Sequence, residues 1–336
     1  MGVRVPYDKL KQDVKQIFLN LGLTEEKAEI CTAVHIQSSA DGVESHGLNR
    51  IPRFVEYVQK GWVNIKGEPQ LAGAKGAVEN YDGQLGIGIT NALFCADRAV
   101  ELAKKHGIGC VALKNTTHWM RGATYVWKMA EAGFMGMSWI NAESCMPLWG
   151  SDKRSVGNNP FCMAIPREDG PLILDMAMSL YAYGKLGVYR LAGKQLPDPG
   201  AIEETMRGLP MGYWKGSGMA LALDMAVALM ANGMSGTDMD IQAKGSCTNC
   251  CQIFIAYDPY LFGSKDEIQD MLNRRIDAVK KAHPEREGGS VSYPGERTLA
   301  VREESMKKGI HVDEAIWKQL CSLASGDMST TDIASK

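Results

Sequence analysis

The segment IGCVALKNTTHWMRGATYVW, residues 108–127, decides the fold class that we expect for this chain. It begins with the continuous apolar run Ile108–Leu113, which is typical of a strand buried on both faces. Polar residues from Asn115 onward connect this run to a helix-like segment that begins at Ala123. The segment therefore predicts a strand, a polar turn and a helix in direct succession.

The flanking sequence continues this alternation. A predicted helix at residues 91–105 precedes the strand, and a second predicted strand, Phe134–Ile140, follows it, which together indicate an α/β layer. His118 lies at the carboxyl end of the first strand, where functional groups gather in such layers, and it is a candidate catalytic residue. The alternative is that His118 caps the helix that follows.

The composition is that of an ordinary globular chain. It has 336 residues, of which 45% are hydrophobic and 23% charged, and its formal net charge is -2. This charge gives no basic field for nucleic acid, so we expect no nucleic-acid partner. No run of about 18 apolar residues could cross a bilayer, and no secretory signal is evident, so we expect no membrane contact and a cytoplasmic location.

Helices are predicted on both sides of this layer. The spacing of Leu10, Val14 and Phe18 predicts a helix over residues 7–20. Thr24 is the expected N-cap of a second helix that ends near residues 39–42. We expect an amphipathic helix at residues 265–281, and we assign no role to the other histidines, which are His35, His106, His283 and His311, the last three in expected surface turns.

A second histidine is preceded by a serine and followed by an arginine. Arg50 lies four residues after His46, and one helical turn would place the two side chains side by side. Arginine can bind a carboxylate through two hydrogen bonds, and imidazole exchanges a proton near neutral pH, so the pair suits a small anionic substrate. The alternative is a solvated histidine at a helix entry and a surface arginine.

Glycine-rich segments offer weaker signals. Gly86-x-Gly88-x-x-Asn91 resembles a dinucleotide-binding fingerprint but lacks its third glycine, and we expect Thr90 to cap the helix at 91–105. The loop 208–218, before a predicted helix at 219–230, could present N–H groups and a lysine to an anion. Asp175 ends an apolar run, where it could bind a ribose or a backbone turn.

The nine cysteines are scattered, mostly within apolar runs. This distribution is unlike a secreted disulfide framework. Cys247, Cys250 and Cys251 could supply half of a zinc site, but no matching second pair of ligands is evident, so we assign no metal. The alternative is a loop that runs into a buried strand.

Several motifs occur in the order found in the type-2 malate/L-lactate dehydrogenases, and the chain resembles that family. They are Ser45-His46-Gly47, Asn115-x-x-His118, Gly157-x-Asn159-Pro160, Asp175-Met176, Trp214-Lys215-Gly216 and Pro294-Gly295-Glu296. The resemblance implies an α/β fold of the L-sulfolactate/malate dehydrogenase type, with a mixed sheet flanked by helices. It also implies a non-Rossmann NAD(P)-binding domain and a homodimer.

The resemblance also implies roles for single residues. His46 and His118 match the two histidines assigned to proton transfer, without deciding which is the donor, while Ser45 and Arg50 match the substrate-binding positions. The matching cofactor-binding segments contain Leu174, Asp175, Met176, Ala177, Met178, Trp214, Lys215, Gly295, Glu296 and Arg297.

On this basis we expect a reductase for a sugar-derived 2-keto acid, with NADH as the first choice of cofactor and NADPH as the second. The alternatives are another 2-hydroxy-acid dehydrogenase, for malate, lactate or ureidoglycolate, or a non-catalytic homologue that binds a small molecule. We expect residues 1–120 to associate with residues 260–336, and residues 121–259 to form the central NAD(P)-binding portion. The junction Pro197–Asp198 lacks the longer Asp- and Gly-rich segment usual in the family.

Overall fold

The computed structural model describes residues 2–191, 193–195, 201–202, 207–245 and 247–329. The Pro197–Asp198 junction lies outside these residues. The helices are α1 (Tyr7–Asn20), α2 (Glu25–Ala40), η1 (Glu44–His46), η2 (Leu48–Arg50), α3 (Ile51–Gln59), α4 (Gly88–His106), α5 (Ala123–Glu131), α6 (Tyr183–Leu191), α7 (Trp214–Ala231), α8 (Gly236–Gln242), α9 (Lys265–Lys280), α10 (Glu296–Lys308) and α11 (Glu314–Ala324). The strands are β1 (Gly2–Val5), β2 (Gln70–Lys75), β3 (Val78–Asp82), β4 (Ile108–Thr117), β5 (Met135–Ile140), β6 (Phe161–Ile165), β7 (Leu172–Met176), β8 (Ala201–Ile202), β9 (Arg207–Gly208), β10 (Thr248–Tyr257) and β11 (Ile310–Asp313).

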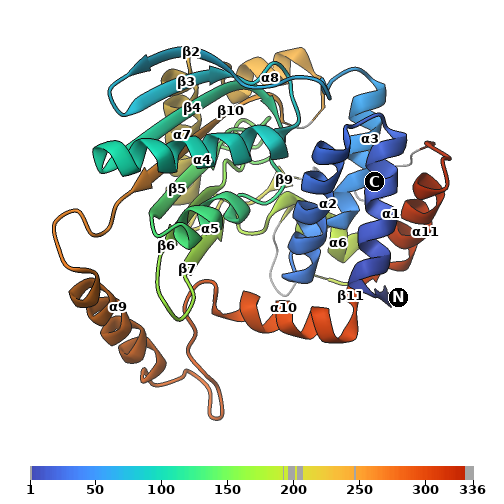
Figure 1. The fold of residues 1–336 in the computed structure, drawn as a ribbon. Helices are drawn as coiled ribbons and strands as arrows, with labels where there is room; N and C mark the ends of the chain where they lie inside the picture. Colours follow the sequence, from blue (N-terminus) through green and yellow to red (C-terminus); the bar gives the residue numbers. More distant parts are fainter. Residues whose placement is uncertain (1, 192, 196–200, 203–206, 246, 330–336) are drawn as a thin grey trace.

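A seven-stranded sheet in the order β2-β3-β4-β10-β5-β6-β7 forms the centre of the molecule (Figure 1). β3 and β4 are parallel, and the other neighbouring strands are antiparallel. This arrangement confirms the predicted mixed sheet flanked by helices. β10 comes late in the sequence yet lies between β4 and β5.

Helices cover both faces of the sheet, which explains the continuous apolar run in β4. Val111 and Leu113 pack in one hydrophobic cluster with α4 and α5, while Ala112 packs in another with α7. All three side chains are therefore buried. β4 continues beyond the predicted end to Thr117, and Asn115 in it has a φ of 54°. Part of the expected polar turn is thus a bent strand end.

A separate helical layer surrounds a third hydrophobic cluster that is formed mainly by α1, α2, α3 and α11. The predicted helix at 7–20 is confirmed, and Thr24 caps α2 by accepting a hydrogen bond from the N–H of Lys27. The predicted cap at Thr90 is wrong. α4 begins at Gly88, and the Thr90 hydroxyl donates to the carbonyl of Ile87 from within the first turn.

The predicted division at residue 120 stays a prediction, although the central sheet takes strands from both sides of that position. His311 lies in β11 rather than in the expected surface turn, because β11 pairs with β1 and links the two ends of the described chain. Within the described ranges, no single helix is long and apolar enough to cross a membrane. α7 and α8 meet these two criteria only as a pair, bent by 83°.

Candidate active site

A cavity of about 380 Å³ lies where the loop after β4 meets the end of β7, the start of α10 and the segment before η2. Of the predicted site residues, it is lined by Ser45, His46, His118, Leu174, Asp175, Ala177 and Gly295. These residues come from four separate parts of the chain. The fold therefore brings together most of the segments that the sequence singled out.

The two histidines stack against each other in the wall of this cavity. Their ring centroids are 5.6 Å apart and their planes differ by 15°. The N–H of Met120 donates a hydrogen bond of 2.9 Å to Nδ1 of His118. Nδ1 of His46 lies 2.9 Å from the hydroxyl of Ser45, which can either donate or accept.

Glycines at the start of α4 allow the His118 loop to take this position. A Cβ atom on Gly88 would overlap the carbonyl oxygens of Thr117 and His118, and the N–H of Gly88 donates to the Thr117 hydroxyl over 3.0 Å. That hydroxyl in turn donates to the carbonyl of Gly86 over 2.9 Å. The glycines of the incomplete fingerprint thus serve close packing of α4 against the end of β4.

Both imidazoles favour the neutral form. Burial lowers the pKa of His46 to about 3, and the charges of Arg50, Arg121 and Arg53 act in the same direction. Burial also holds the pKa of His118 well below its usual range, with His46 as the next cause. In the protein without substrate, burial therefore disfavours an imidazolium at either histidine near pH 7.

Arg50 lies close to the cavity but not in the predicted arrangement. Gly47, with φ of -111° and ψ of -133°, separates η1 from η2, so His46 and Arg50 do not share one helical turn. Nε of Arg50 donates to the carbonyl of Ser45 over 2.8 Å. Arg50 and His118 both line a small cavity beside the main one. Arg50 is thus positioned by the backbone next to the histidines.

Asp175 binds a backbone turn, one of the two alternatives that its position left open. Its Oδ2 accepts a hydrogen bond of 3.1 Å from the N–H of Ala123, the first residue of α5. Its Oδ1 accepts from the Cys162 thiol over 3.2 Å. The carboxylate therefore satisfies a helix N-terminus while it lines the cavity.

The other predicted cofactor-binding residues do not line this cavity. Met176 and Met178 pack in the cluster beneath α7. α7 begins at Trp214 rather than Met219, so Trp214 and Lys215 form its exposed first turn. Glu296 and Arg297 start α10 beside the cavity residue Gly295.

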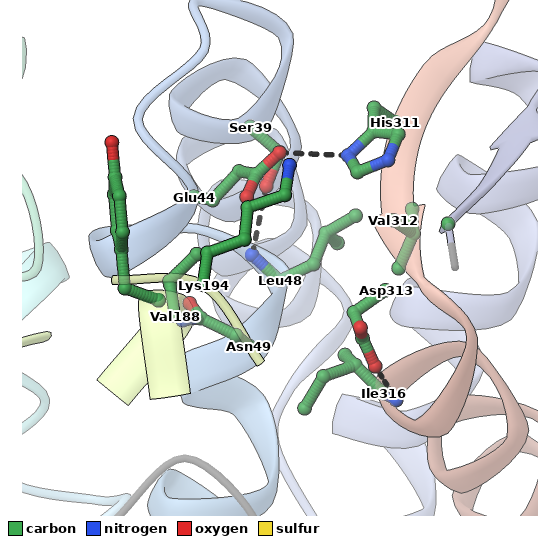
Figure 2. A pocket seen from close by; sticks show the side chains of 12 residues that line it. Ser39, Glu44, Leu48, Asn49, Val188, Lys194, His311, Val312, Asp313 and Ile316 are labelled. Atoms are coloured by element: carbon green, nitrogen blue, oxygen red, sulfur yellow. Dashed lines mark hydrogen bonds and ion pairs between the residues drawn. The ribbon is translucent and has the colours of Figure 1, made fainter. Parts of the chain in front are cut away.

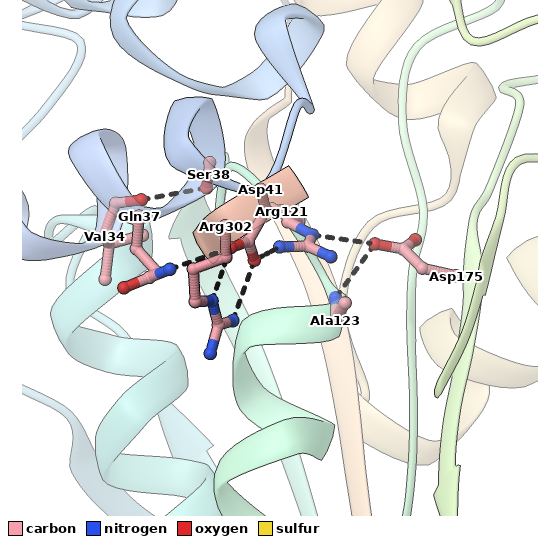
Figure 3. Close-up of polar contacts among 8 residues, drawn as sticks. All are labelled: Val34, Gln37, Ser38, Asp41, Arg121, Ala123, Asp175 and Arg302. Carbon is pink, nitrogen blue, oxygen red and sulfur yellow. Dashed lines mark hydrogen bonds and ion pairs between the residues drawn. The ribbon is translucent and has the colours of Figure 1, made fainter. Parts of the chain in front are cut away.

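Sequence reasoning assigned no role to Arg121 or to Asn158 and Pro160, which also line the cavity. Arg121 is buried and forms an ion pair with Asp41 (Figure 3). The sequence signal that could have indicated it is a single charged residue among the uncharged residues Trp119, Met120, Gly122 and Ala123.

A second cavity, of about 500 Å³, is lined by Glu44 of η1 and by residues of η2 and β11 (Figure 2). Nδ1 of His311 lies within hydrogen-bond distance, 2.7 Å, of Oε1 of Glu44 in its wall. Asn49 also lines it, and neither polar atom of the Asn49 amide has a hydrogen-bond partner among the described residues. Glu44 lines this cavity and His46 lines the main one, so η1 contributes side chains to both.

The cysteine-rich segment begins β10. Cys247, Cys250 and Cys251 are buried free thiols, and Cys247 lines the main cavity. Burial raises the pKa of each of these thiols. In the part of the chain that the structure describes, no group of three or more His, Cys, Asp or Glu side chains could hold a metal ion.

Comparison with known proteins places this architecture among dehydrogenases. Residues 5–321 match the family described as malate/L-lactate dehydrogenase. The chain is 38% identical to the 2,3-diketo-L-gulonate reductase of Citrobacter koseri and 39% identical to that of Haemophilus influenzae, in each case over 96% of this chain and 100% of the relative. The malate dehydrogenase structure from Pyrococcus horikoshii OT3 superposes with a TM-score of 0.87 at 26% identity, covering 98% of this chain and 97% of that one.

Proposed function

Because this chain belongs to the malate/L-lactate dehydrogenase family, and is thus an oxidoreductase acting on CH–OH or keto groups, we propose that it reduces a sugar-derived 2-keto acid. The first candidate reaction converts 2,3-diketo-L-gulonate to 3-dehydro-L-gulonate, because relatives that align over their full length carry the name of that reductase. The observation that carries the proposal is the stacked pair His46 and His118 in the wall of the cavity.

The walls of the cavity fit a nicotinamide cofactor, with NADH as the first choice and NADPH as the alternative. Leu174, Asp175 and Ala177 form one wall, and Gly295 forms another. Gly295 has a φ of 95°, and no side chain caps the first turn of α10, so the positive end of the helix dipole there favours a phosphate. Glu296 and Arg297 extend this turn, while for Met176, Met178, Trp214 and Lys215, which do not line the cavity, the resemblance alone supports a role in cofactor binding. When bound, the cofactor supplies the hydride.

His46 is the better proton donor of the two histidines. A backbone N–H always donates, so the bond from Met120 occupies the Nδ1 lone pair of His118 and fixes its proton on Nε2. Forming an imidazolium at His118 would break that bond. The Ser45 hydroxyl beside His46 can reverse its role, so His46 can carry protons on both nitrogens. His118 then donates a hydrogen bond from Nε2 to the keto oxygen.

Arg50 supplies the positive charge that orients the substrate. Its guanidinium lies beside His118, in a region where Arg53 adds further positive charge. A carboxylate bound there fixes the direction of the neighbouring carbonyl, and it also favours protonation of His46 by offsetting the charges of the arginines.

A substrate panel tests the function directly. Absorbance at 340 nm is followed with NADH and with NADPH against 2,3-diketo-L-gulonate, pyruvate, oxaloacetate and a neutral ketone of similar size. We expect turnover of the diketo acid, and a KM for the neutral ketone at least ten times higher. Absence of turnover with every keto acid would favour a non-catalytic binding protein, and a preference for oxaloacetate or pyruvate would indicate the malate or lactate alternative. Equal KM values would contradict the role of Arg50.

The low pKa of His46 predicts a distinctive pH dependence. Above a pKa of about 3 the free protein rarely holds the proton that reduction consumes, so kcat/KM should fall about tenfold per pH unit through neutrality. The carboxylate of a bound substrate raises the pKa of His46. Because kcat reports on the complex with substrate, kcat should begin to fall at a higher pH than kcat/KM does. Initial rates from pH 5 to 9 measure both curves. If kcat/KM and kcat fall together, with one midpoint near pH 6.5, the neutral resting state is wrong.

An exposed apolar stripe supports a homodimer. Leu221, Met225 and Leu229 follow each other at intervals of four residues on α7 and are 40%, 64% and 80% exposed. Tyr213 and Trp214 extend the same apolar surface at the start of α7. A surface of this kind normally contacts another protein. Sedimentation equilibrium at micromolar concentration should give twice the chain mass of 36.7 kDa, and a single monomeric species would exclude the dimer.

All nine cysteines are free thiols, which fits a reducing compartment such as the cytoplasm. We therefore assign the protein to the cytoplasm. Fractionation of the source cells, with a disulfide-bonded secreted protein as the marker for the other compartment, tests this assignment. Recovery with that marker would contradict it.

A further inference from the structure

One buried carboxylate, that of Asp41, connects three segments of the chain: α2, α10 and the loop after β4, of which the last lines the cavity through Arg121. Asp41 accepts hydrogen bonds from Gln37, from Arg302 over 2.7 and 3.0 Å, and from Nη1 of Arg121 (Figure 3). The side chain of Asp41 is 1% exposed and that of Arg121 is 6% exposed. Water therefore screens this ion pair only weakly.

Both residues of this ion pair lie close in sequence to one of the stacked histidines. Asp41 ends α2 and precedes His46 by five residues, while Arg121 follows His118 by three. The ion pair thus joins the two segments that carry the stacked histidines. Arg302 approaches the same carboxylate from α10 and stacks on Trp127, outside the cavity.

Arg121 is also held on its other side. Its Nε lies 3.8 Å from Oδ2 of Asp175 and, although buried, makes no hydrogen bond. Among the residues that the structure describes, the guanidinium therefore lies between two carboxylates, with a hydrogen bond to Asp41 and a longer ion pair to Asp175. This asymmetry indicates that Asp41 fixes where Arg121, and with it the loop after β4, is placed.

We propose that Arg121 is a positioning residue for the reduction: bound to Asp41, it holds the loop of His118 against the segment of His46, so that both imidazoles face one substrate oxygen. This inference rests on the proposed function. Arg121 acts through the histidines and needs no contact with the substrate. The requirement is geometric, since a displacement of about 1 Å in a catalytic group can cost on the order of 100-fold in rate.

Three variants separate positioning from general stability. Arg121→Met should lower kcat by about 100-fold with a change in KM of less than about threefold, because the histidines lose their alignment while Arg50 still binds the carboxylate. Arg121→Lys keeps a cation near Asp41 and should recover part of kcat. Arg302→Met removes the other guanidinium from the same carboxylate without touching the loop of His118, and it should keep kcat within about threefold of wild type.

Thermal unfolding of each variant shows whether it is folded. If Arg302→Met and Arg121→Met lose equal stability and equal kcat, the effect is structural and the proposal is overturned. The proposal is also overturned if Arg121→Met retains kcat, or if its loss appears only in KM.

A measurement that does not depend on turnover tests the positioning role of Arg121 separately from the proposed function. The ¹⁵N spectrum of the imidazoles should show His118 of the wild type as a single tautomer with its proton on Nε2, because Met120 donates to Nδ1. Arg121→Met should show mixed tautomers, and Arg302→Met should not. Mixed tautomers in a protein that reduces no keto acid would support the positioning role and refute the function, while an unchanged spectrum in Arg121→Met would refute the role.

Discussion

His46→Asn is expected to lower kcat for keto-acid reduction by about 10²–10⁴-fold, because asparagine cannot supply the proton that the developing alkoxide requires. His118→Asn should cost less, since its amide N–H can still donate a hydrogen bond in place of Nε2. Steady-state rates at 340 nm, with substrate well above KM, measure both losses.

His106→Asn is the matched control for these variants, because His106 is the exposed last residue of α4 and takes no part in the cavity. It should leave kcat and thermal stability unchanged. If both His46→Asn and His118→Asn turn over at the wild-type rate, the assignment of proton transfer to these histidines is wrong. A larger loss for His118→Asn than for His46→Asn would exchange the two roles.

Gly88→Ala should destabilise the protein by about 3 kcal/mol and displace His118. The added Cβ would overlap two backbone carbonyls, those of Thr117 and His118, and neither can rotate away as the end of a side chain can. The start of α4 and the end of β4 must therefore separate. Urea unfolding gives the loss of stability, and kcat should fall together with it.

Gly73→Ala provides the comparison for this variant. A Cβ on Gly73 would meet no atom within 4 Å, and its φ is not positive. Its free energy of unfolding should stay within about 1 kcal/mol of wild type. Equal stability of Gly88→Ala and Gly73→Ala would show that the chain at the start of α4 adjusts more easily than its packing indicates.

Local patterns predicted single elements well. The apolar run in β4 indicated a buried strand because both faces of that strand are covered, and Thr24 indicated a cap because the capping hydrogen bond spans only three residues. The start of α7 was predicted five residues too late. Gly216 and Gly218 suggested a loop, yet a Cβ on Gly216 would lie 2.6 Å from the carbonyl of Met178, so close packing requires that glycine within a helix.

The site was predictable where position along one strand decides it, and less so where distant segments meet. His118 follows β4 directly, and its place in the cavity agrees with the strand-end argument. The shared helical turn predicted for His46 and Arg50 was wrong because Gly47 separates η1 from η2, although Arg50 still lies close enough to His46 for its charge to lower the pKa of that histidine. The contact of Arg121 with Asp41 joins residues 80 positions apart, and no local pattern encodes it.

The placement of β10 between β4 and β5 has a consequence for synthesis of the protein. When β5 leaves the ribosome, β10, which pairs with both β4 and β5, is still more than a hundred residues away. That distance corresponds to roughly 5–20 s of translation. During that time the inner edges of β4 and β5 have unpaired backbone groups in the nascent chain and could pair with another strand. Closure of the sheet, and with it a firm support for the His118 loop, must therefore come late, and chaperones would have most effect on this protein within that interval.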